Sequence, residues 1–150
     1  MRPYIQVLGA AVLALAASTA YAEKWEDYSP SKEVWNVTQV KVQPSKVDDY
    51  LKTLKQTLIP NLEIEKRDGQ VLDYKVLVNM NGASAGATVI IMTQFTSLAA
   101  MAPDKERDLR QRSEMRKTLP KQESEKINDT RGSYRSFIDG GTYWNVEFGK

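Results

Sequence analysis

The amino-acid sequence predicts an α+β fold in which helices cover one face of an antiparallel sheet, and three observations carry this prediction. Two runs rich in β-branched and aromatic residues, Val71–Val78 and Ala87–Phe95, flank a loop of small residues, as in a hairpin. A stripe of aliphatic residues at helical spacing precedes the hairpin, and a long charged segment follows it. Strand patterns also occur near both ends, at Val34–Val42 and Thr142–Phe148.

The first 22 residues have the pattern of a cleavable export signal. Arg2 precedes the apolar run Val7–Ala17, and Ala20-Tyr21-Ala22 supplies the small residues of a cleavage site. The run is shorter than the ~20 apolar residues of a spanning helix, although a retained membrane anchor is the alternative. We therefore expect a mature single domain of residues 23–150, with its core at 34–148, in the periplasm or secreted.

The residue inventory excludes several classes of function. The chain has no cysteine and no histidine, which removes disulfides, thiol nucleophiles, the usual zinc sites, His-ligated haem and Ser-His-Asp catalysis. Its 21 basic residues nearly balance its 19 acidic ones, and cleavage of the signal removes Arg2 to leave a net charge of +1. We therefore expect no metal, no cofactor and no nucleic-acid partner.

Val34–Val42 is the first predicted strand, and the preceding segment Glu23–Lys32 is expected to be an irregular lead-in. The apolar residues change phase between Val37 and Val40. Either a β-bulge intervenes or both faces of this strand are partly buried.

A helix is predicted to begin at Pro44-Ser45, with Ser45 as its cap and Asp48 in the capping-box position, and to end at Asp68-Gly69. Pro60 has no amide hydrogen, so a kink or a restart is expected near residues 58–61. The apolar face of this helix comprises Val47, Leu51, Leu54, Leu58 and Leu62.

The hairpin strands differ in how they alternate. Val71–Val78 places most of its apolar residues on one face, whereas Ala87–Phe95 hardly alternates, as in a central strand covered on both sides. The loop Asn79–Gly86 contains the turn dipeptide Asn81-Gly82. A phosphate-binding loop is the alternative, but no Lys-Ser/Thr ending and no helix follow it.

The charged segment Asp104–Lys126 is predicted to be an exposed helix that breaks at Pro120. A short turn capped by Ser97 precedes it. A basic surface for nucleic acid or anionic lipid is the alternative, but interspersed acidic residues favour a solvated face. Ile127–Asp139 is expected to be a loop with a short edge strand, Tyr134–Ile138, before a turn at Asp139-Gly140-Gly141 and a last strand.

The order strand, helix, strand, strand, helix, strand is that of ferredoxin-like folds. On this order, and on Trp35…Val40-Lys41-Val42-Gln43-Pro44, Tyr50-Leu51, Pro60 and Phe95-Thr96-Ser97, the chain resembles the dimeric α+β barrel superfamily from Val34 to Phe148. This superfamily includes cofactor-independent antibiotic-biosynthesis-type monooxygenases and small stress-related proteins. The resemblance implies a homodimer in which two sheets pack face to face.

The resemblance also implies a small apolar pocket between the two sheets. A ligand with an aromatic or planar acidic portion would stack on tryptophan and bind a guanidinium group. The alternative is that the aromatic residues belong to the core or to the dimer interface. The candidate ligand-binding residues are Trp35, Asn36, Tyr74, Arg135, Trp144 and Asn145.

Two functions remain open from the sequence. The first is an exported, homodimeric, non-catalytic binding or stress-related module. The second is a cofactor-independent monooxygenase that acts on a small aromatic substrate. No general acid or base can be assigned, because Asp48 and Asp49 are explained by the helix start and Glu63 and Glu65 do not share a helix face.

Overall fold

A computed structural model describes residues 22–81 and 86–149 and confirms the ferredoxin-like α+β fold. Its four-stranded antiparallel sheet has the order β2-β3-β1-β4. The strands are β1 (Tyr28–Val42), β2 (Val71–Val78), β3 (Val89–Phe95) and β4 (Arg135–Phe148). β1 and β3 are therefore the central strands.

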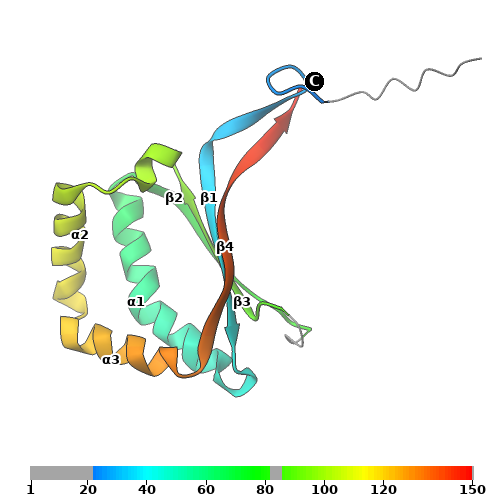
Figure 1. Ribbon diagram of the computed structural model, residues 1–150. Coiled ribbons are helices and arrows are strands. Elements are labelled where there is room, and N and C mark those ends of the chain that lie inside the picture. The colour runs from blue at the N-terminus through cyan, green and yellow to red at the C-terminus, as the bar shows by residue number, and fades with distance from the viewer. Residues whose placement is uncertain (1–21, 82–85, 150) are drawn as a thin grey trace, which may run out of the picture.

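The helices lie on one side of this sheet. They are η1 (Pro44–Lys46), α1 (Val47–Arg67), η2 (Leu98–Met101), α2 (Lys105–Thr118) and α3 (Lys121–Gly132). Figure 1 shows α1 along the sheet, α2 outside α1, and α3 crossing one end of both. Within the part of the chain that the structure describes, no element covers the other face, which we call the open face.

The core forms where α1 packs on the sheet. It comprises the buried residues Val40, Val42, Tyr50, Leu54, Val89 and Tyr134. Val47, Leu51 and Leu58 of the predicted apolar stripe pack against this cluster, and Leu62 is buried nearby. The helical spacing therefore identified the correct face of α1.

The start of α1 differs from the expectation. Ser45 does not cap it, because Pro44–Lys46 form a separate 3-10 turn and the helix begins at Val47 without a side-chain cap. Of the kink or restart expected near residues 58–61, the restart does not occur, because the helix runs through Pro60. Leu54 and Leu62 are buried on either side of Pro60, so packing offsets the hydrogen bond that the proline cannot make. The predicted end is confirmed, with Gly69 at φ +75°.

The first strand begins at Tyr28, earlier than the expected Val34. The expectation that Glu23–Lys32 is irregular was therefore wrong for its second half, which belongs to β1. The reason is long-range pairing, because Tyr28 lies opposite Phe148 and Pro30 lies opposite Val146. Figure 1 shows this β1–β4 ribbon extending beyond β2 and β3.

The C-terminal third contains two helices and one long strand. Asp104 caps α2 by accepting from the Arg107 amide, and the break near Pro120 is confirmed. The expected loop at Ile127–Asp139 was wrong, because α3 continues to Gly132.

The expected edge strand at Tyr134–Ile138 is present as the start of β4, which lies at the sheet edge. The turn at residues 139–141 was wrong, because β4 runs through them without reversing. A Cβ on Gly140 would lie 3.1 Å from the carbonyl oxygen of Val37, so glycine permits close strand approach here.

A register shift opposite Gln39 and Val40 leaves Ile138 as an extra residue in β4. The bulge expected within β1 is not there, because β1 pairs with β3 without a shift from Val34 to Val40, and its apolar residues instead lie on both faces.

The hairpin is confirmed, although its second strand starts at Val89 instead of Ala87. The predicted Asn81-Gly82 turn lies partly outside the described residues. Across residues 22–81 and 86–149, none of the helices has the length and apolar character needed to cross a membrane.

Candidate functional site

Strand register assigns side chains to the two faces of the sheet, because directly opposed residues lie on the same face. Val40 of β1 is paired with Val89 of β3, and both are in the core under α1. The helix-covered face therefore continues along β1 through Thr38 and Asn36, with Thr93 opposite Asn36. These polar residues line the space between this face and the helices.

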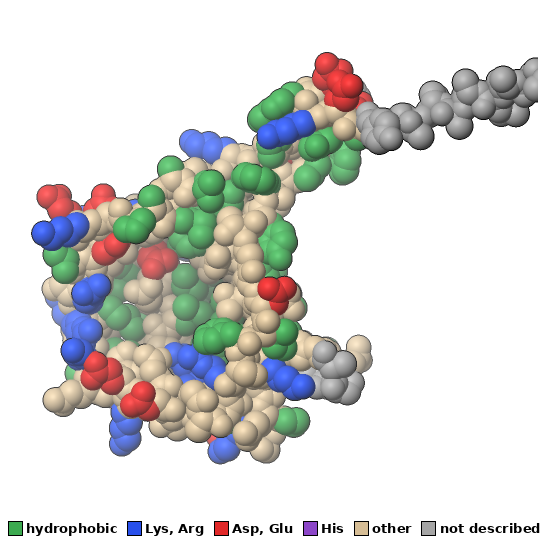
Figure 2. Space-filling view, in the orientation of Figure 1, with side chains coloured by type: hydrophobic (Ala, Val, Ile, Leu, Met, Phe, Trp, Pro, Cys, Tyr) green, Lys and Arg blue, Asp and Glu red, His purple; other side chains and the backbone are tan. Residues whose placement is uncertain are grey.

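A cleft of about 510 Å³ lies between this face and the helices, and we call it the sheet cleft. Figure 2 shows the hollow between the helical layer and the sheet. Its volume lies within the range of roughly 300–1,000 Å³ that is typical of small-molecule sites. Its apolar lining comprises Leu54, Leu58, Ile91, Met115, Leu119 and Phe137.

Tyr50 contributes a buried polar atom to this cleft. It shares one face of α1 with Leu54, Thr57 and Asn61, at spacings typical of a helix, and all of these residues line the cleft. Tyr50 is 0% exposed, and its hydroxyl has no hydrogen-bond partner among the described residues. A buried hydroxyl in this state destabilises the fold unless something else satisfies it.

Arg131 enters the cleft from α3 and is only 7% exposed. Its Nη1 donates to Thr57 Oγ1 at 3.0 Å, and its Nη2 donates to Asn128 Oδ1. Its Nε has no partner in the described part of the chain. Burial, followed by the charge of Arg135, lowers the pKa of the Arg131 guanidinium below its ordinary value.

Arg135 approaches the same region from β4. Its guanidinium carbon lies 5.8 Å from the centroid of the Tyr50 ring and 4.8 Å from that of Phe137. Within residues 22–81 and 86–149, neither Arg131 nor Arg135 forms an ion pair. The sheet cleft thus has two arginines, an apolar wall and no carboxylate to compensate their charge.

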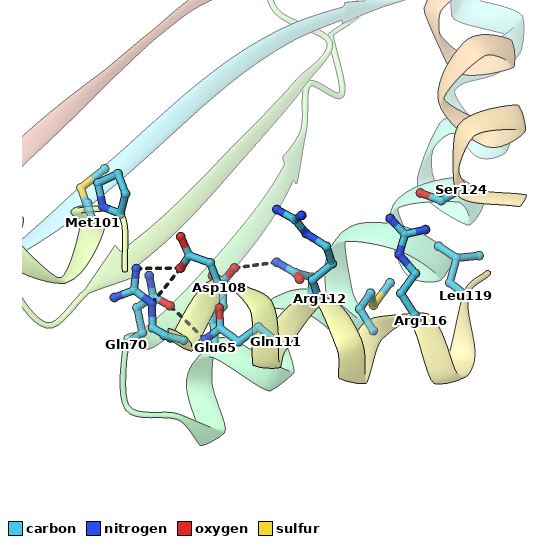
Figure 3. Close-up of a pocket in the computed structure, with 13 residues that line it drawn as sticks. Glu65, Gln70, Met101, Asp108, Gln111, Arg112, Arg116, Leu119 and Ser124 are labelled. Carbon is cyan, nitrogen blue, oxygen red and sulfur yellow. Dashed lines mark hydrogen bonds and ion pairs between the residues drawn. The ribbon is translucent and has the colours of Figure 1, made fainter. Parts of the chain in front are cut away.

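A second cleft, of about 460 Å³, lies between α1, η2 and α2 and is called the helix cleft (Figure 3). It adjoins the sheet cleft, since Asn61 and Leu119 line both. Its lining is mainly charged and polar, and Arg112 and Arg116 extend from α2 in Figure 3. The Arg107–Asp108 pair at 3.0 Å shows that part of its charge is already compensated.

Paired charges hold α2 against α1 and so maintain both clefts. Arg67 makes a two-pronged contact with Glu114, at 2.7 and 2.6 Å, and Arg110 Nη2 lies 3.0 Å from Asp68 Oδ2. The hydrogen bond from Arg110 is the main cause of a lowered pKa at Asp68, and that from Arg67 is the main cause of a lowered pKa at Glu114.

Glu65 lies at the helix cleft, and burial raises the pKa of its carboxyl although Asn61 donates a hydrogen bond to it. An acid with a raised folded-state pKa stabilises the fold at low pH, and this contribution is lost as pH rises through that pKa. We therefore expect Glu65→Gln to raise the free energy of unfolding at pH 7, by less than about 1 kcal/mol because water partly screens the group. Urea unfolding at pH 7 and at pH 3 measures this difference, which should vanish at the lower pH. The exposed Glu147→Gln is the control, and a Glu65→Gln protein that is less stable at pH 7 would contradict the expectation.

Two of the six predicted ligand residues, Asn36 and Arg135, line the sheet cleft. Tyr74 is on the same face of the sheet, but its hydroxyl donates to Glu63 of α1 at 2.5 Å. This bond raises the pKa of Tyr74 and directs its hydroxyl to α1.

The other three lie elsewhere. Trp35 is on the open face, where the Lys75 ammonium lies 5.3 Å from its ring centroid. Trp144 and Asn145 belong to β4. Trp144 lies opposite Val34 on the helix-covered side of the sheet but is exposed, and the backbone amide of Asn145 donates to Ser31 Oγ at 3.2 Å. The six predicted ligand-binding residues therefore do not form one site within a single chain, and their role in ligand binding stays a prediction.

The open face carries apolar side chains from every strand. Val37 lies opposite Met92, and Leu77 lies opposite Ile90. Leu77 is 47% exposed and Tyr143 is 50% exposed in the single chain. Polar residues such as Gln39, Lys75 and Gln94 share this face, and the exposed apolar residues among them mark the open face as a candidate interaction surface.

Sequence reasoning missed Tyr50 and Arg131 as site residues. The spacing of Tyr50, Leu54 and Asn61 would have extended the helical stripe to include a tyrosine. No sequence pattern marks Arg131 as a site residue, because its segment was interpreted as a loop. Among the described residues no group of three acidic side chains could hold a metal ion.

No protein-family model and no curated protein matches this chain. Protein SO0527 from Shewanella oneidensis has a similar solved structure, with 16% identity, a TM-score of 0.50, and coverage of 80% of this chain and 98% of that one. SnoaB, a cofactor-independent oxygenase from Streptomyces nogalater, aligns with 10% identity and a TM-score of 0.43 over 75% of this chain and 92% of its own. A dimeric protein of unknown function and ferredoxin-like fold from Bacteroides fragilis aligns with 11% identity and a TM-score of 0.38 over 80% and 99%. The expected ferredoxin-like resemblance is confirmed at the level of the fold.

Proposed function

We propose that this chain is an exported, homodimeric, non-catalytic module that binds a small organic molecule in the sheet cleft. The observation that carries the binding function is the cleft itself. Apolar side chains share its lining with polar and basic ones from the helices and the sheet, so it can hold both an apolar body and a polar group of one small molecule.

The homodimer is supported by the open face. Leu77 and Tyr143 remain about half exposed, and Val37, Ile90 and Met92 share their side of the sheet. A second copy would present the same apolar surface, so a two-fold pairing would bury both open faces at once. The predicted pocket between the two sheets would form only in this dimer, so the ligand role of Trp35 on the open face remains a proposal. Trp144 lies opposite Val34, on the helix-covered side of the sheet, and would not face that pocket.

Filling the sheet cleft is expected to abolish ligand binding. Thr38 lines the cleft from the centre of β1, and Thr38→Phe would place a ring in its volume. We expect the neutral fluorescent dye Nile red to bind the unmodified chain at one site per chain and to bind Thr38→Phe at least about tenfold more weakly, because the volume it needs is occupied.

The matched control is Lys32→Phe, which adds the same ring at an exposed position of β1. It should bind the dye like the unmodified chain. Equal binding by the Thr38→Phe protein and the unmodified chain would contradict the sheet cleft as the site.

Export is supported by the sequence of residues 1–22, which lie almost entirely outside the described part of the chain. Its test is the mass of the protein recovered from the periplasm or medium of a bacterial host. We expect the mass of a chain whose first residue is Glu23. An uncleaved chain retained in the cell membrane would contradict export with signal cleavage.

A further inference from the structure

We infer that the ligand of the sheet cleft is a small organic carboxylate, whose charged group binds Arg131 and Tyr50 and whose apolar body lies along the cleft wall. This inference rests on the proposed binding function and names its ligand class. It starts from the charge balance of the cleft. Among the described residues, every side chain that lines it is neutral or basic.

Arg131 is the main argument for a negative charge. A buried guanidinium is normally paired with a carboxylate, because a buried charge without a counter-charge is strongly destabilising. Here its hydrogen-bond partners, Thr57 and Asn128, are neutral, and the Arg135 guanidinium, whose charge helps to lower the pKa of Arg131, is also positive. A bound anion would supply the missing counter-charge to both arginines.

Two unused hydrogen-bond donors point to the same ligand. The Nε–H of Arg131 and the hydroxyl of Tyr50 are both buried without a partner in the described residues. The Arg131 guanidinium carbon lies 6.0 Å from the Tyr50 ring centroid, so both groups belong to one corner of the cleft. A carboxylate has two acceptor oxygens and no donor, which matches two donors in a positively charged corner.

The rest of the cleft indicates the body of the ligand. Leu54 and Leu58 of α1, Ile91 of β3 and Leu119 after α2 supply apolar lining to the same cleft. Arg135 lies against the Phe137 ring, which leaves a flat cationic surface at the edge of the site. A planar aromatic group joined to a carboxylate fits this combination, whereas an amine would meet two like charges.

The test compares 2-naphthoate with the neutral 2-naphthalenemethanol by isothermal titration calorimetry. Charge-assisted hydrogen bonds should make the carboxylate bind about 10- to 100-fold more tightly. Arg131→Gln should reduce this preference to within about twofold. The control Lys126→Gln removes an exposed charge from the same helix and should keep the preference.

Tyr50→Phe provides a second variant in case Arg131→Gln does not fold. It removes only the unpaired hydroxyl and keeps the ring under Arg135, so we expect a folded protein that binds 2-naphthoate at least about threefold more weakly. Equal affinity of the unmodified chain for both probes would overturn the carboxylate inference and leave the proposed binding function standing. If neither probe binds, the carboxylate inference and the proposed binding function are both overturned. Tight naphthoate binding that neither variant changes would also overturn them, because the site would then lie elsewhere.

Discussion

Met92→Glu is expected to convert the proposed homodimer into a folded monomer. Met92 lies near the middle of the open face, between Val37 of β1 and Lys75 of β2. In the dimer the new carboxylate would be removed from water together with the Lys75 ammonium across from it, and the cost of desolvating two such charges, several kcal/mol for each, can exceed the energy that their attraction returns. The dissociation constant of the dimer should therefore rise by at least about a hundredfold. Size-exclusion chromatography with light scattering measures the change in mass.

The fold should survive this substitution, because the carboxylate would lie directly across from the Lys75 ammonium in the monomer. The matched control is Met80→Glu, at a position that is 96% exposed and outside the sheet. It should leave the mass unchanged. A Met92→Glu protein that stays dimeric would show that the open face is not the interface.

Leu54→Ala should cause a large loss of stability without changing the fold. Leu54 is buried between α1 and the sheet, in contact with the cluster that includes Val40 and Tyr50. Truncation removes buried apolar surface and leaves a cavity, so the free energy of unfolding should fall by about 2–5 kcal/mol. Urea denaturation followed by circular dichroism measures this change.

Leu109→Ala is the control for this experiment. Leu109 is an exposed residue of α2, and its truncation should change the free energy of unfolding by no more than about 0.5 kcal/mol. If the two leucine variants lost similar stability, the core would not lie where α1 meets the sheet.

Local patterns predicted most of the fold. The helical stripe identified the buried face of α1, and β-branched composition located β2 and β3 to within two residues. The errors occurred where distant pairing overrides local signals. Tyr28–Lys32 becomes a strand only because β4 lies beside it, and Gly140 stays within a strand because its missing side chain permits close contact with β1.

The candidate site was less predictable, because it depends on segments far apart in the sequence. Arg131 matters because α3 crosses the end of the sheet and brings it to Thr57 and Tyr50. No pattern near Arg131 indicates that crossing. The monooxygenase alternative stays a prediction, and oxygen uptake with a phenolic substrate remains its test.

The pairing of two copies over the open face is the central claim, and sedimentation equilibrium of the unmodified chain tests it most directly. Over roughly a hundredfold range of concentration, the molecular mass should be twice that of one chain and should fall toward one chain only on strong dilution. A folded protein that sediments as a single chain at every concentration would contradict the claim.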